Sequence, residues 1–477
     1  MGDDRRISTL KSYPSYRESG LHWLGRVPGH WDVRPAFGAF VPNRERNHGM
    51  KEKTVLSLSY GRIVIKPADK LHGLVPESFE TYQIVNPGDI ILRTTDLQND
   101  HTSLRVGMVR DRGIITSAYL ALRAVAGVNP EFGFQLLNVW DTSKAIYGYG
   151  SGLRQNLDFS HFKRMPVAVP PPDEQAAIVR FLDWANGRLE RAIRAKRKVI
   201  ALLNEQKQAI IHRAVTRGLD PAVPLKPSGI PWLGDIPQHW EVRRLGHAIR
   251  LQTGFPFAST GFVQGESGTR LLRGINVTPS GIRWDEAVRW QRKPGDGLDE
   301  FALEVGDIAL GMDRPIIGSG VRAAPIREND TPSLLLQRVA RLRPTDNLDA
   351  KFLLLLLRGR LFRDYIAPIF TGISVPHLSP QQIKGFRVPL PLLKEQQDIV
   401  RHLEVETSGL DVAASRLERE IELLREYRTR LVADVVTGKL DVREAAAGLP
   451  DEAPPDTAED AADLGDELET ETEGIEA

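Results

Sequence analysis

The chain contains the same segments twice, and this internal duplication constrains its possible fold more than any other feature. Residues 19–34 and 228–243 share the pattern Ser-Gly-x-x-Trp-Leu-Gly-x-x-Pro-x-His-Trp-x-Val-Arg, with ten of 16 positions identical. Residues 167–182 and 388–403 match at eight of 16 positions, in the same order along the chain. Such repeats indicate one structural unit used twice. Between the matching blocks the halves diverge, which predicts a shared scaffold that carries two different specificities.

Each half has the same predicted plan, a strand-rich region followed by a long helix. Short apolar runs alternate with Gly, Pro, Asn and Asp, as is typical of strands and turns. A proline-rich stop then leads into the helix, and Asp173 is the expected N-cap of the first one. The expected fold class is α+β: two mixed α/β domains separated by two long antiparallel helices that form a coiled coil, with a pseudo-two-fold internal repeat. The predicted segments are the domains at 1–165 and 221–387, the spacer helices at 166–220 and 388–445, and an acidic tail at 446–477.

Both helical segments carry apolar residues at the alternating spacing of four and three that is typical of a coiled coil. Polar residues, including Lys196 and Glu420, interrupt this seam. Residues 173–217 have a net charge of +5 and residues 395–439 a net charge of −3, so we expect the helices to pair with each other. Solvated helix faces without a preferred partner are the alternative. The seam residues predicted to bind a partner are Ile178, Leu182, Leu189, Leu203, Ile399, Leu403, Leu410 and Leu424.

The overall charge of the chain hides a strongly basic body. The last 27 of its 477 residues hold 12 Asp and Glu and no Lys or Arg; because the whole chain carries +1, the remainder carries +13. We expect the acidic tail to be disordered, since it lacks the apolar residues that a core requires. A basic body indicates an anionic partner such as nucleic acid.

Several function classes are disfavoured by what the sequence lacks. The chain has no cysteine, which excludes disulfides, thiolate metal sites and a cysteine nucleophile. It has neither a complete GxxxxGK[ST] loop nor the Asn/Asp-Pro-Pro-Tyr/Phe motif of amino-methyltransferases. These absences argue against a methyltransferase or a P-loop ATPase, and 11 His without an HExxH motif give little basis for a catalytic zinc site. It also lacks a membrane-length apolar run and a secretory signal, so the expected compartment is the cytoplasm.

The repeated frame resembles the opening of each half of a type I restriction–modification specificity subunit. The Pro-Pro-x-Glu-Gln-x-x-Ile-Val-x-x-Leu pattern at residues 171–182 and the Val-Thr…Leu-Asp ending at 215–220 are similar to conserved regions of that family. The Leu-Arg-Gly-Ile-Asn-Val segment at residues 272–277 resembles part of its target recognition domains. The resemblance covers residues 10–445 and leaves out the acidic tail.

This resemblance implies a DNA-specificity subunit that is not itself an enzyme and that has no catalytic residues, no metal and no cofactor of its own. Each target recognition domain would read one half of a bipartite, asymmetric site in double-stranded DNA. The helices would set the spacing and dock two methyltransferase subunits, which use S-adenosylmethionine to methylate adenine. Restriction subunits, which use ATP and Mg, would join through them. A coiled-coil interaction adaptor without DNA readout is the alternative.

Basic and polar residues in the divergent loops are the candidates for DNA contact. Lys and Arg neutralise phosphates, and Arg, Asn and Gln also hydrogen-bond to base edges. For each residue, an ordinary solvated surface position is the alternative. By contrast, we expect structural roles for residues of the shared frame, namely Trp23, Trp31, Trp232, Trp240, His30 and His239. The DNA-binding candidates are Ser57, Tyr60, Arg62, Lys66, Arg93, Thr94, Thr95, Asp96, Arg105, Arg273, Asn276, Arg314 and Arg322.

Overall fold

The structure, a computed structural model, divides the chain into two compact units. It describes residues 10–20, 24–67, 78–95, 97, 104–149, 156–263, 265–318, 320–370 and 376–450. Of these, the first unit holds residues 10–196 and 419–450, and the second holds residues 197–418. The division falls inside both long helices, so each unit combines one of the predicted domains with a part of each helix.

Two long helices, α4 (Pro172–Arg217) and α8 (Leu393–Val436), contribute to both units. Because α4 begins at Pro172, the expected cap Asp173 lies in its first turn instead. The fixed φ of proline suits the first helical position and explains this start. Within the described ranges, no helix is long and apolar enough to cross a membrane.

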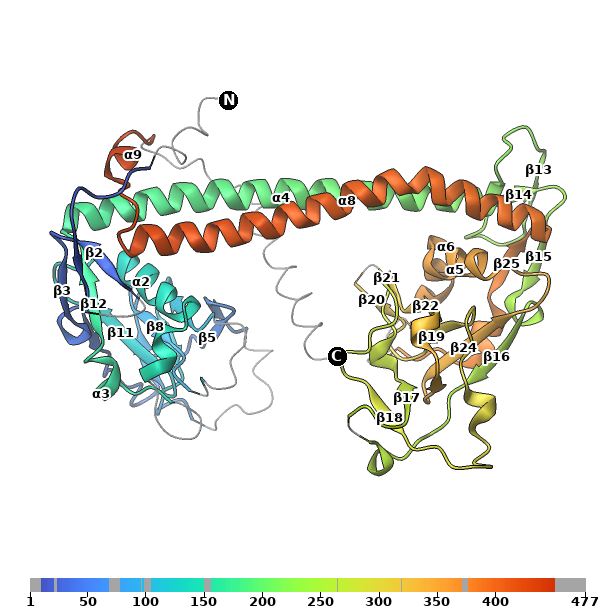
Figure 1. The fold of residues 1–477 in the computed structure, drawn as a ribbon, viewed down its shortest axis with the longest axis horizontal. Helices are drawn as coiled ribbons and strands as arrows, with labels where there is room; N and C mark the ends of the chain where they lie inside the picture. The colour runs from blue at the N-terminus through green and yellow to red at the C-terminus, as the bar shows by residue number, and fades with distance from the viewer. Residues whose placement is uncertain are drawn as a thin grey trace. The chain divides into compact units, whose positions relative to one another are not determined.

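The remaining elements of the first unit are short strands and short helices (Figure 1). Its strands are β1 (Tyr16–Glu18), β2 (Arg26–Pro28), β3 (Asp32–Pro35), β4 (Phe40–Pro42), β5 (Leu56–Ser59), β6 (Arg62–Ile65), β7 (Gln83–Val85), β8 (Ile90–Leu92), β9 (Val106–Met108), β10 (Gly113–Ile115), β11 (Leu120–Ala124) and β12 (Pro166–Val169). Its helices besides the long ones are α2 (Pro130–Thr142), α3 (Phe159–Phe162) and α9 (Arg443–Ala447).

The second unit has a similar content of short elements. Its strands are β13 (Leu225–Pro227), β14 (Asp235–Pro237), β15 (Glu241–Arg244), β16 (Ile249–Thr253), β17 (Thr269–Leu272), β18 (Val288–Trp290), β19 (Ile308–Gly311), β20 (Ile316–Ile317), β21 (Gly320–Val321), β22 (Ala323–Pro325), β23 (Ser333–Leu335), β24 (Val339–Pro344) and β25 (Arg387–Leu390). Its short helices are α5 (Ala350–Arg358), α6 (Arg360–Ile366) and α7 (Pro380–Gly385).

Both units are built on the same four-stranded antiparallel sheet. Its strand order is β4-β11-β8-β9 in the first unit and β16-β24-β19-β22 in the second. Two smaller pairings also recur: β3 with β12 corresponds to β15 with β25, and β1 with β2 corresponds to β13 with β14. The structural repeat therefore extends into regions where the sequences of the two halves diverge.

An ion pair between a buried Asp and a partly exposed Arg connects strands of the sheet at the same place in each unit. Asp89, 1% exposed, accepts bonds from Arg123 Nε and Nη2 at 2.8 and 3.0 Å. Asp307, also 1% exposed, accepts the equivalent bonds from Arg343 at 2.6 and 2.9 Å. Each Asp follows a glycine with positive φ. Each also caps its own turn, because its carboxylate accepts a hydrogen bond from the backbone N–H of the residue three positions earlier. Residues 88–90 and 306–308 both read Gly-Asp-Ile, and this short sequence match between the halves marks the shared feature.

The two units differ in the elements added to the common sheet. The first adds the β5–β6 hairpin and the β7–β10 pair. The second adds a three-stranded sheet, β18-β17-β23, and the small β20–β21 hairpin. One scaffold with two different insertions is the arrangement that the sequence predicted.

Segments of α4 and α8 pack against each other within each unit. In the first, Ile178, Leu182 and Ala185 share a buried cluster with Leu431 and Val435. In the second, Ile211 and Val215 share one with Ile399 and Leu403. Ion pairs give the direction of this packing: Glu190 contacts Arg428 whereas Lys196 contacts Glu420, so numbering rises along one helix while it falls along the other and the paired segments are antiparallel. In the second unit Lys207 contacts Asp411 while the later residues Ile211 and Val215 pack with the earlier residues Ile399 and Leu403, which is the same direction.

Ion pairs connect the two helices within each unit. In the first unit Lys196 Nζ lies 2.5 Å from a Glu420 carboxylate oxygen, and Arg428 Nη1 lies 3.2 Å from Glu190. In the second unit Lys207 Nζ lies 2.5 Å from Asp411. Lys196 and Glu420, two of the polar interruptions of the seams, are thus partners of each other.

Replacement of Asp307 with Ala should destabilise the second unit by about 3 kcal/mol, because Arg343 and a turn N–H lose their buried acceptor. Hydrogen exchange of the β19 and β24 amides measures the loss. Asp285→Ala is the control, since that side chain is 75% exposed and forms an exposed ion pair with Arg283 at 3.2 Å; it should change stability by less than about 0.5 kcal/mol. Equal protection of these amides in both variants would contradict the assignment.

Candidate nucleic-acid interface

The residues of the repeated His-Trp motif form a structural anchor at the start of each long helix. In the first unit Trp31 Nε1 donates to Glu174 Oε1 at 2.7 Å, and His30 Nε2 lies 2.8 Å from Glu174 Oε2. In the second, Trp240 Nε1 and His239 Nε2 each lie 3.0 Å from Glu395. Both Trp side chains are at most 1% exposed, so neither is available to stack on a base.

The first anchor is more deeply buried and has an additional donor. The Tyr13 hydroxyl donates to Glu174 Oε1 at 2.5 Å. Burial, followed by this bond to Glu174, raises the pKa of Tyr13, which keeps the phenol protonated as a donor. Trp232 is partly buried against the second core, as expected for a frame residue, and Trp23 lies outside the described residues.

The glutamine that follows each anchor Glu ties the helix to the globular part. Gln175 donates to Pro170 O and Gly127 O at 2.8 and 3.0 Å and accepts from Asn129 N at 2.7 Å. Gln396 makes the same three bonds with Pro391 O, Asn347 O and Asp349 N. Asn129 and Asp349 in turn cap α2 and α5. The Glu-Gln motif therefore positions the helices rather than a ligand.

In the first unit, the β5–β6 hairpin presents two of the predicted cations to solvent. Tyr60 and Gly61 form its turn with φ of 44° and 78°, and Arg62 and Lys66 are exposed on and after β6. Ser57 and Tyr60 are half-buried. The hairpin belongs to the insertion that distinguishes this unit, so its cations lie where sequence-dependent contacts are expected.

The loop after β8 carries the next predicted group. Arg93 is exposed, whereas Thr94 is 7% exposed and its carbonyl accepts from Leu157 N at 2.9 Å. Thr95 is half-buried, and Asp96 lies outside the described residues. Arg93 is therefore the described side chain of this loop that solvent, and hence a ligand, reaches most easily.

In the second unit, Arg314 is exposed on the loop that follows β19. This residue adopts a φ of 42°, and its N–H donates to Pro376 O at 2.8 Å. Nearby, Asp313 accepts from Arg338 at 2.7 Å and lies 2.5 Å from His377 Nδ1. Burial raises the pKa of Asp313, but the bonds to Arg338 and His377 outweigh it and lower the pKa overall. The loop thus has a fixed backbone and an exposed cation.

Four of the predicted contact residues are used mainly for internal bonding. Arg105 is 6% exposed and donates to Thr95 O at 2.5 Å. Arg322 is 7% exposed, and burial lowers its pKa. Asn276, 3% exposed, accepts from Arg273 N and donates to Arg283 O. The Arg273 side chain itself donates to Glu286 O. Sequence could not separate these polar groups from exposed ones, because their bonding partners lie up to 48 residues away.

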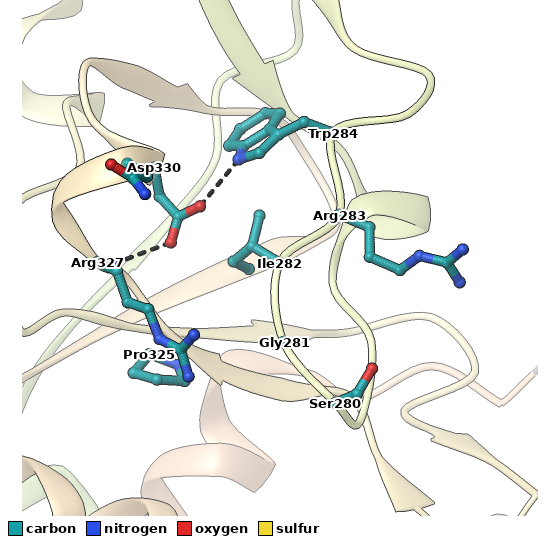
Figure 2. A pocket seen from close by; sticks show the side chains of 9 residues that line it. Ser280, Gly281, Ile282, Arg283, Trp284, Pro325, Arg327 and Asp330 are labelled. Atoms are coloured by element: carbon teal, nitrogen blue, oxygen red, sulfur yellow. Dashed lines mark hydrogen bonds between the residues drawn. The ribbon is translucent and has the colours of Figure 1, made fainter. Parts of the chain in front are cut away.

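A cavity of about 330 Å³ opens in the second unit between residues 280–284 and 325–330. Figure 2 shows Trp284 Nε1 and Arg327 N donating to the two carboxylate oxygens of Asp330, at 2.9 Å each. The guanidinium groups of Arg283 and Arg327 do not converge on one point (Figure 2). Among the described residues, no group of three or more His, Asp or Glu side chains is arranged to hold a metal ion.

The helix residues predicted to bind a partner are occupied by the chain's own packing. Ile178, Leu182 and Ile399 are fully buried, and Leu189 and Leu403 nearly so. The remaining members of that set are half-buried: Leu203, Leu410 and Leu424. The apolar side chains that the long helices expose are different ones: Val199, Leu202, Leu393, Val405, Val412, Leu423 and Tyr427.

Comparison with known proteins relates this arrangement to one family. A family model described as the type I restriction modification DNA specificity domain matches residues 288–423. The chain is 27% identical over 366 residues to the type I restriction enzyme MjaVIII specificity subunit of Methanocaldococcus jannaschii, covering 76% of this chain and 81% of that protein. It is 28% identical over 208 residues to the EcoAI specificity subunit of Escherichia coli, covering 43% and 34% of the two chains.

A solved structure shares the fold. It comes from work on complex assembly and conformational transition of the type I restriction–modification system. The match has a TM-score of 0.59 with 15% sequence identity and covers 87% of this chain and 99% of the other.

Replacement of Glu174 with Ala should destabilise the first unit by roughly 3 kcal/mol, because buried Trp31 and Tyr13 lose their acceptor. The matched variant Glu395→Ala should destabilise the second unit by only about 1 kcal/mol. The reason is that the Glu395 side chain is 30% exposed, whereas that of Glu174 is 2% exposed. Hydrogen exchange at the N-terminal turns of α4 and α8 reports each effect separately. A larger loss for Glu395→Ala would contradict this ranking.

Proposed function

The chain belongs to the family of type I restriction–modification specificity subunits, and from this membership we propose that its two units read the two halves of one split DNA site. The protein is the subunit that confers sequence specificity. The proposal that each unit reads one half-site rests on one observation: the common four-stranded sheet appears in both units with different insertions. Two different readers on one scaffold would recognise a bipartite site whose halves differ in sequence.

Exposed cations on these insertions and loops support DNA as the ligand. Arg62, Lys66 and Arg93 in the first unit and Arg314 in the second are exposed on loops or at strand ends. Residues 1–450 carry a net charge of +13. Binding would then release counterions from the phosphates, so affinity would fall steeply as salt rises. Residues beside these cations would add the base contacts that give specificity.

The two long helices would set the distance between the half-sites. They contain 46 and 44 residues, which corresponds to about 65–70 Å of helix for each. Antiparallel pairing of a basic helix with an acidic one, as a coiled coil, would keep this length constant. The ion pairs Lys196–Glu420 and Lys207–Asp411 support such a pairing within each unit.

Catalysis would come from partner subunits. We infer that this chain supplies no catalytic group, and that two methyltransferase subunits dock on it and methylate adenine with S-adenosylmethionine. Restriction subunits that use ATP and Mg would join through them. Exposed apolar side chains on the helices, such as Val405 at 76%, Val412 at 69% and Leu423 at 58%, support a docking surface there.

A fluorescence anisotropy titration tests the proposal against that of a coiled-coil adaptor. A DNA duplex that contains the site should bind weakly to the chain alone and tightly when methyltransferase subunits are present, and its affinity should fall as the salt concentration rises. Binding that is absent, or insensitive to salt, both with and without these subunits would favour the adaptor.

Insertion of one heptad into both helices, after Lys198 in α4 and after Glu418 in α8, should lengthen the gap between half-sites. Seven residues add about 10 Å, or about three base pairs. The half-site sequences should stay the same, because the recognition units are unchanged. Methylated sites of the variant can be mapped by sequencing; altered half-site bases with an unchanged gap would contradict the spacer role.

A further inference from the structure

A buried arginine occupies the same position in both units, immediately before the outer strand of the common sheet. Arg105 precedes β9 and Arg322 precedes β22, and they are 6% and 7% exposed. The backbone environment is equivalent as well. Arg93 N donates to Arg105 O at 2.9 Å, and Gly311 N donates to Arg322 O at 2.8 Å.

Each of these arginines holds the loop that follows the inner strand. Arg105 Nη1 donates to Thr95 O at 2.5 Å, and Arg322 Nη1 donates to Asp313 O at 2.9 Å. One residue earlier, the loop is fixed from its other side in both units. Leu157 N donates to Thr94 O at 2.9 Å, and Leu378 N donates to Met312 O at 2.8 Å. The loop backbone is therefore clamped at two successive carbonyls.

In the second unit the same guanidinium also holds a second loop. Arg322 Nε donates to Val277 O at 3.0 Å, and its Nη2 donates to Gly274 O. It thus connects residues 312–314 with the segment that follows β17. A planar guanidinium presents several donors in a fixed arrangement, which one Lys ammonium cannot reproduce.

Glycines make room for this side chain. A Cβ at Gly311 would lie 3.2 Å from the Arg322 side chain, and one at Gly274 would lie 3.3 Å from its Nη2. The loop it holds carries Arg314, which is exposed. Arg322 itself points its donors at backbone oxygens.

We propose that Arg105 and Arg322 are positioning residues, one for each half-site: each fixes the loop through which its unit reads base pairs and makes no contact with DNA. The proposal rests on the proposed function. It predicts that the two residues act independently, since each belongs to one unit.

The test measures base discrimination by the full chain in complex with its methyltransferase subunits. Three duplexes are used: the intact site, and the site with one base pair changed in either half. Arg322→Lys should reduce discrimination at one half-site on the order of tenfold, and leave the other half-site unchanged. Arg105→Lys should reduce discrimination at the other half-site and leave the first one unchanged. Thermal unfolding of each variant monitors folding.

The salt dependence of DNA affinity distinguishes a positioning role of Arg322 from a direct contact with phosphate. Arg322→Met removes the charge, yet the slope of log affinity against log salt should stay at the wild-type value. Arg314→Gln is the matched control, because loss of an exposed phosphate contact should lower that slope by about 1. If Arg322→Met fails to fold, Arg322→Lys decides, since a direct phosphate contact would tolerate Lys.

Full discrimination at both half-sites in Arg322→Lys and Arg105→Lys would overturn the proposal, and so would a reduced salt slope in Arg322→Met. Equal loss of discrimination at both half-sites would also overturn it, because that result indicates general destabilisation. Absence of site-specific binding by the wild-type complex would instead refute the proposed function.

Discussion

The hydrogen bond between a glutamate carboxylate and a buried Trp, at the start of each long helix, is the interaction on which the architecture of each unit depends. Glu174 and Glu395 each accept the indole N–H of a buried Trp and contact the neighbouring His. The next residue, Gln175 or Gln396, then fixes the N-cap of a second helix, α2 in the first unit and α5 in the second. A helix connected in this way has a defined direction relative to the sheet of its own unit. Loops at the sheet's edge are consequently presented in a fixed orientation.

The duplication explains how one scaffold can carry two specificities. The anchors, the capped helices and the ion pairs Asp89–Arg123 and Asp307–Arg343 lie in the common part of the fold. Differences are concentrated in the β5–β6 hairpin of the first unit and in the three-stranded sheet of the second. Because stability and orientation come from the common part, the insertions can differ in sequence without changing the frame that presents them.

Sequence alone predicted the frame and the long helices, because these features repeat at regular spacing. The common sheet was harder to detect, since only short matches such as Gly-Asp-Ile link its strands between the halves. Individual contact residues were the least predictable. Arg105 and Arg314 look alike as charged residues in divergent regions, yet one is buried against backbone carbonyls and the other is exposed. Burial depends on neighbours far along the chain, and residue type does not reveal it.

Sequencing of methylated DNA from cells that express this chain with its methyltransferase subunits tests the central claim most directly. If each unit reads one half-site, the modified adenines will define a single motif of two different short sequences separated by a gap of fixed length. A continuous motif, or two identical half-sites related by a palindrome, would contradict the division of recognition between the two units.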